Sequence, residues 1–156
     1  MRPDTKIFSF AIVAAFLTGF VASPVALRLI SPAEGAAAAL TPMTIDLTTI
    51  EPGDLGTTPY PELRSKTLVT TDNATIALQA GNVAKHTHPK TDEIQYIVEG
   101  SGTIWLGTER KEFKPGTLIV IPKGTAHAGS IVTNGPVKAI AIKIPPQPAG
   151  DIVFVD

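Results

Sequence analysis

The 156-residue sequence has no cysteine, few aromatic residues and almost no net charge. The absence of cysteine excludes disulfides, thiolate metal sites, iron–sulfur clusters and cysteine nucleophiles. The 13 basic and 14 acidic residues leave a formal net charge of −1. That balance provides no basic field for a phosphate backbone, so we expect no nucleic-acid partner. The length is typical of one domain.

Only three histidines are present, at positions 86, 88 and 127. Metal or acid–base chemistry near neutral pH must therefore use these imidazoles or the carboxylates. No phosphate-binding or dinucleotide-binding glycine motif occurs in the sequence.

The N-terminus has the layout of an export signal. Arg2 and Lys6 precede an uncharged apolar run at residues 7–22, and small residues at 35–39 offer cleavage sites. We expect residues 1–38 to be a signal peptide, with an uncleaved membrane anchor as the alternative. The chain is then periplasmic or secreted, or held at the membrane through this segment alone.

Beyond residue 31, no stretch has a sustained helical period, and 14 prolines and 13 glycines indicate many turns. Short segments rich in Val, Ile and Thr predict an all-β fold, an antiparallel sandwich or barrel. We expect an extended arm at 39–65, the barrel at 66–144 and a C-terminal tail at 145–156, with an edge strand that a second copy in a homodimer covers. The predicted strands are 66–71, 74–79, 83–88, 93–99, 103–106, 117–121, 126–131, 137–144 and 152–155. Turns are predicted at 100–102 and 134–135, among other places.

His86 and His88 are two residues apart on a predicted strand, so their side chains leave the same face. Glu93 begins the next strand, and pairing of the two strands as a hairpin points it into the same space. His127 follows a second turn. Three imidazoles and one carboxylate suit one divalent transition metal (Fe, Mn, Ni, Cu or Zn) and disfavour Ca or Mg.

These residues also resemble the two signature motifs of the cupin family. The first motif has a glycine, a His-x-His pair, a glutamate and a second glycine, found here as Gly81, His86, His88, Glu93 and Gly100. One departure is that four residues, rather than the common five, separate Gly81 from His86.

The second motif has a glycine, a Pro-x-Gly turn and a histidine, found here as Gly116, Pro122, Gly124 and His127. A second departure follows it, because Ile131 replaces the asparagine that the family carries four residues after the histidine. Neither departure removes a ligand.

The resemblance implies a conical antiparallel β-barrel, also called a double-stranded β-helix or jelly-roll-like fold. It implies that His86, His88, Glu93 and His127 bind a metal inside the barrel and leave coordination positions open. Strand alternation from Glu93 also turns Gln95 inward, as a substrate-binding or hydrogen-bonding residue or as a polar filler. Lys143 is read as an exposed strand-end lysine, with a carboxylate anchor as the alternative.

The resemblance favours a metal-dependent enzyme acting on a small organic molecule, either a dioxygenase or an isomerase or lyase. The alternative is a non-enzymatic cupin that binds a small ligand or a metal outside the cytoplasm. A second titratable pair inside the pocket would favour an enzyme, and the sequence offers only Gln95 as a candidate there.

Overall fold

A computed structural model describes residues 39–156, which form one curled sheet of nine strands. Within this range the helical segments are two short 3-10 turns, η2 (Leu47–Thr49) and η3 (Pro52–Asp54). The all-β, double-stranded β-helix fold predicted from the sequence is therefore confirmed. The strands are β1 (Gly56–Thr57), β2 (Leu63–Thr70), β3 (Thr75–Gly81), β4 (His86–Thr87), β5 (Asp92–Leu106), β6 (Glu109–Phe113), β7 (Leu118–Ile121), β8 (His127–Ile144) and β9 (Val153–Phe154).

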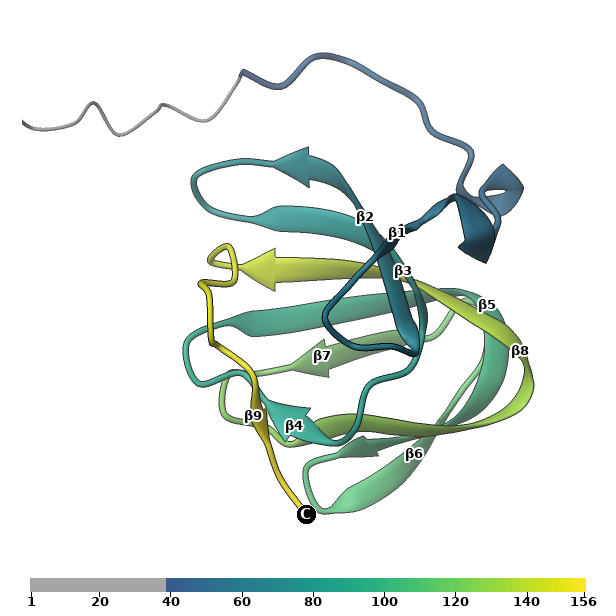
Figure 1. Cartoon of the computed structure of the whole chain (residues 1–156), viewed down its shortest axis with the longest axis vertical. Helices are drawn as coiled ribbons and strands as arrows, with labels where there is room; N and C mark the ends of the chain where they lie inside the picture. Colours follow the sequence, from purple (N-terminus) through teal and green to yellow (C-terminus); the bar gives the residue numbers. More distant parts are fainter. Residues whose placement is uncertain (1–38) are drawn as a thin grey trace, which may run out of the picture. The chain divides into compact units, whose positions relative to one another are not determined.

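Two long antiparallel strands, β5 and β8, form the frame of the fold. They pair from Asp92 opposite Ile144 to Leu106 opposite His127, with several register shifts between. Figure 1 shows both strands bending together around one side of the barrel. Near one end β8 also pairs with β3, and near the other it pairs with β4. The β5–β8 pair therefore continues from the part of the sheet that contains β3 to the part that contains β4.

The turns predicted at 100–102 and 134–135 are wrong, because β5 and β8 continue through these residues without a break. Gly100 and Gly102 instead allow two backbones to come close. A Cβ built on Gly102 would lie 2.2 Å from the carbonyl oxygen of Ile131, and one on Gly100 would lie 2.6 Å from that of Pro136. The glycines therefore mark the bend of a strand pair and not its end.

Strand β6 was not predicted from the sequence. Its first four residues are exposed and charged, and only Phe113 is buried. The usual alternation of apolar and polar residues is therefore missing. Strand β9 lies where the C-terminal strand was predicted, and it pairs with β4 beside the site (Figure 1).

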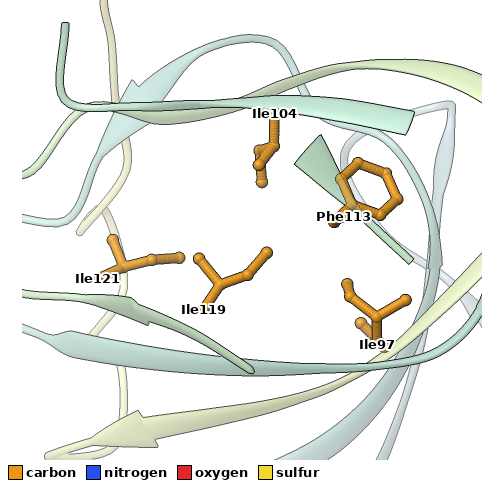
Figure 2. Packing of buried hydrophobic residues seen from close by; sticks show 6 residues of the cluster. Ile97, Ile104, Phe113, Ile119 and Ile121 are labelled. Carbon is orange, nitrogen blue, oxygen red and sulfur yellow. The ribbon is translucent and has the colours of Figure 1, made fainter. Parts of the chain in front are cut away.

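The core lies inside the curl. Ile97 from β5, Phe113 from β6 and Ile119 and Ile121 from β7 are each at most 6% exposed, and their side chains point toward Ile104 (Figure 2). Alternation along β7 leaves its other two residues exposed. This apolar cluster fills part of the barrel. The three histidines and Glu93 are buried in the same interior.

Residues of the predicted arm pack against the barrel. Leu55 is 2% exposed and joins Leu78 of β3 in a second apolar cluster. The buried Lys138 donates a hydrogen bond from Nζ to the Ile50 carbonyl oxygen at 3.0 Å, and its Nζ lies 2.8 Å from Glu99 Oε2. Strand β2 begins within the predicted arm, at Leu63 rather than at residue 66.

The predicted export segment at 1–38 lies outside the described residues. Within residues 39–156, no helix has the length and apolar character needed to cross a membrane.

Candidate metal centre

The three histidines and Glu93 lie together in the interior, brought there by three different strands. His86 in β4 pairs directly with His127 at the start of β8, and His88 follows β4 by one residue. Glu93 enters from β5. All four are nearly inaccessible to water, with exposed fractions of 5% or less.

Each imidazole is held at Nδ1 by a backbone carbonyl oxygen. His86 Nδ1 lies 2.8 Å from the Ala84 oxygen, His88 Nδ1 lies 2.7 Å from the Asp151 oxygen, and His127 Nδ1 lies 2.9 Å from the Thr125 oxygen. A carbonyl oxygen only accepts hydrogen bonds, so each Nδ1 carries the proton and donates it. A neutral ring held in this way presents the lone pair of Nε2.

These lone pairs converge. One ring nitrogen from each histidine lies within 4.8 Å of the others, and His127 Nε2 is buried without a hydrogen-bond partner. Glu93 Oε2 lies 3.0 Å from His88 Nε2 and 3.4 Å from His127 Nε2. Electron-pair donors that face one another repel unless a proton or a cation lies among them. The residues present therefore fit a divalent transition metal bound by nitrogen and oxygen.

The protonation states favour the same use. Burial is the main cause that lowers the pKa of His86, to about 4, and the neighbouring His127 and His88 lower it further. Burial alone would raise the pKa of Glu93, but the His127 and His88 rings lower it when they carry a proton at Nε2, and the charge of Lys143 and the hydrogen bond from Gln95 lower it as well, so that together they outweigh burial. The pKa of Glu93 is thus held well below its ordinary value. Near neutral pH, a neutral His86 and an ionised Glu93 are both ready to bind a metal.

Lys143 does not point into solvent as a strand-end lysine would. Its side chain is 14% exposed, and Nζ lies 3.6 Å from Glu93 Oε2 and 3.3 Å from His88 Nε2. It also donates a hydrogen bond to Gln147 Oε1. The exposed position expected from the sequence is therefore wrong. Lys143 pairs directly with Glu93 in the β5–β8 register, which places both side chains on the inner face.

Gln95 lies next to Glu93 on that face and donates a hydrogen bond from Nε2 to Glu93 Oε1 at 2.9 Å. A cavity of about 80 Å³ opens beside these groups, and His86, Glu93, Gln95 and Lys143 are among the residues that line it. This volume accommodates several waters or a small organic ligand. A contact between Gln95 and a substrate stays a prediction.

Two features of the site were missed by sequence reasoning. The inward position of Lys143 follows from alternation along β8, where Ala139 and Ala141 are also buried. The alternation itself is visible in the sequence, but only the register of β8 shows which of its two faces is the inner one. The carbonyl of Asp151 that holds His88 comes from 63 residues away along the chain. No local pattern indicates that contact.

Residues 71–143 match the family described as Cupin domain. An uncharacterized protein of Methanocaldococcus jannaschii is 39% identical over 71 residues, which make up 46% of this chain and 57% of that protein. The match thus spans little more than half of the length of this relative.

Several solved structures share the fold. KdgF from Halomonas sp. superposes with a TM-score of 0.51 at 22% identity, covering 57% of this chain and 84% of that chain. The nucleoside dehydratase Pac13, from Streptomyces, superposes with a TM-score of 0.54 at 15% identity, covering 67% and 88%. A double-stranded β-helix protein of Klebsiella pneumoniae gives 0.53 at 13% identity, covering 71% and 99%. At these identities the likeness shows the fold alone. Residues 71–143 are thus similar to a cupin domain, and the solved structures support the shared fold.

Proposed function

We propose that this chain is a metal-dependent cupin enzyme acting on a small polar organic molecule. The observation that carries the proposal is the shared orientation of the three imidazoles. Each donates from Nδ1 to a carbonyl oxygen, which leaves three converging Nε2 lone pairs, and Glu93 Oε2 lies 3.0 Å from His88 Nε2 and 3.4 Å from His127 Nε2. A bound divalent metal would supply Lewis-acid or redox chemistry at this position.

The chain's own side chains favour an enzyme over a protein that only binds. Lys143 lines the same cavity as Glu93 and adds a second ionisable side chain beside the carboxylate. Gln95 donates to Glu93 Oε1, so it orients the carboxylate. The Lys143 ammonium can hold an anionic group or donate a proton at Nζ, and the apolar Ile97 and Ile104 restrict water on the core side of the cavity.

Metal content tests the proposal first. Purified full chain should retain about one transition-metal ion per molecule after dialysis, and the double variant H86A/H88A should lose it. T87A is the matched control, because Thr87 lies between the two histidines and shares the short strand β4 with His86. Circular dichroism checks that both variants remain folded. Full metal retention in H86A/H88A would contradict the site.

Oxygen consumption separates the two proposed chemistries. A dioxygenase consumes oxygen when a substrate is converted, whereas an isomerase or lyase turns its substrate over equally well without oxygen. Screening small diols, flavonols and keto acids with an oxygen electrode, in parallel with anaerobic assays of product formation, makes this distinction. Conversion of none of these compounds, together with tight metal retention, would favour the binding-only alternative.

We also propose that the chain acts outside the cytoplasm, since residues 2–22 have the charge and hydropathy pattern of an export signal. Cell fractionation with a C-terminal tag should place the protein outside the cytoplasm or at the membrane. Recovery of the intact chain from the cytoplasm alone would contradict this proposal.

A further inference from the structure

The cavity beside the candidate metal centre contains the positively charged side chain of Lys143. Its nearby anionic partner is Glu93, which is also a proposed metal ligand. Lys143 Nζ lies 3.6 Å from Glu93 Oε2, and its side chain is only 14% exposed. No other charged basic side chain is found among the lining residues of this cavity that the structure describes. A largely buried ammonium needs a nearby anion, because leaving it unpaired is costly.

Metal binding changes this charge balance. Without a metal, the Glu93 carboxylate offsets the Lys143 charge. A divalent ion bound by three neutral imidazoles and Glu93 takes up that carboxylate, so the ion, Lys143 and Glu93 together carry a net charge of about +2. The metal-loaded cavity then lacks negative charge and favours a ligand that supplies it.

We propose that Lys143 is the anion-binding residue of this cavity and that the ligand is a small organic acid whose carboxylate pairs with Nζ. This inference rests on the proposed metal centre and adds the class of its ligand. The rest of the lining suits such a molecule. Gln79, Gln95 and Ser130 offer uncharged polar groups, and a cavity of about 80 Å³ restricts the acid to a few carbon atoms.

The fold fixes Lys143 in this place. It pairs with Glu93 on one side and with Thr75 of β3 on the other, so it belongs to a central strand of the sheet. Its Nζ donates to Gln147 Oε1, in the segment that follows β8. A lysine on a central strand with a restrained head group is better suited to hold a ligand than a mobile surface lysine.

Cobalt(II) serves as a spectroscopic probe of the full chain. Its visible absorption changes when a ligand enters the coordination sphere, so binding is measured without any activity. Glycolate, a carboxylate with a hydroxyl group, is compared with ethylene glycol, which has two hydroxyls and no charge. The wild type should bind glycolate much more tightly than ethylene glycol.

The variants K143M and K143R test the residue. K143M should weaken glycolate binding by about tenfold to a hundredfold, the usual range for losing a hydrogen bond to a charged group, and should leave ethylene glycol unchanged. K143R keeps the charge and should retain more of the affinity, while K123M removes an exposed lysine outside the cavity and should match the wild type.

The outcomes separate this inference from the proposed function. Equal glycolate affinity in wild type and K143M, or equal affinity of the wild type for glycolate and ethylene glycol, overturns the inference while the metal centre stands. Failure of the wild type to bind cobalt overturns both. A K143M variant that fails to fold leaves K143R to decide, because K143R with no glycolate preference would also overturn the inference.

Discussion

At the scale of single residues, His86 shows how burial keeps an imidazole neutral and so able to bind a metal. Its ring is 5% exposed, and burial together with two neighbouring imidazoles lowers its pKa to about 4. The ring therefore stays neutral at pH values where a free histidine is protonated. The cost is a pH-dependent stability, because protons bind the unfolded chain more readily than the folded one.

The metal-free protein should lose stability as the pH falls from about 6.5 toward 4. In that window the unfolded His86 is protonated while the folded ring is not, so the free energy of unfolding rises with pH. The lowered pKa of Glu93 acts in the same direction at lower pH. Urea unfolding across this range should show a smaller pH dependence for H86Q than for the wild type. Equal slopes would contradict the assigned pKa of His86.

At the scale of elements, the bend of β5 and β8 depends on positions where no side chain fits. The Cβ of an alanine at 102 would lie 2.2 Å from the Ile131 carbonyl oxygen, so the backbones would have to separate. Because these strands carry both Glu93 and His127, the bend also positions the site.

The substitution G102A should therefore lower the free energy of unfolding by about 1–3 kcal/mol, the usual cost of overpacking. G53A is the matched control, since a Cβ on Gly53 meets nothing within 4 Å and the residue lies in a short 3-10 turn. Urea denaturation measures both. A G102A variant as stable as G53A would mean that β5 and β8 can separate at little cost.

Much of this fold could be predicted from local patterns, and the rest depends on distant contacts. Alternation and turn residues indicate an all-β chain, and the spacing of His86, His88, Glu93 and His127 indicates where a metal would bind. Gly100 and Gly102 have the local pattern of a turn. Only the register against β8 shows that they allow the two strands to come close. Lys143 could not be placed without that same register.

At the scale of the whole molecule, part of the outer sheet face is apolar. Tyr96, Leu118 and Val120 are 43%, 60% and 55% exposed, and the half-buried Ile94 and Ile142 lie beside them in register. A sheet face in contact with water normally carries polar side chains. The patch has no charge, so a second copy of itself related by a two-fold axis would cover it without burying an unpaired charge.

The homodimer expected from the sequence stays a prediction. The sequence placed the contact at the C-terminal edge strand, whereas the exposed apolar side chains make this face the place where we now expect it to form. Sedimentation should give a dimer for the wild type and a monomer for L118K/V120K, because two lysines would be buried opposite two others. V132K, which alters an exposed valine on β8 outside the patch, should remain dimeric. A monomeric wild type would contradict this prediction.

Metal binding should also stabilise the protein against heat, since the ion binds the folded site and not the dispersed residues of the unfolded chain. At a metal concentration about a hundred times the dissociation constant, the gain is about 2.7 kcal/mol. Differential scanning calorimetry with and without zinc should show a higher Tm for the wild type and no change for H86A/H88A. A similar rise in both proteins would indicate binding elsewhere.

The most direct test of the metal centre is the protonation of its three rings, because the chain contains no other histidine. Long-range ¹H–¹⁵N NMR of the metal-free protein near neutral pH should show all three protonated at Nδ1 and not at Nε2. Addition of one equivalent of zinc should then shift all three Nε2 resonances together. A ring protonated at Nε2 alone, or Nε2 resonances that zinc leaves unmoved, would contradict the account.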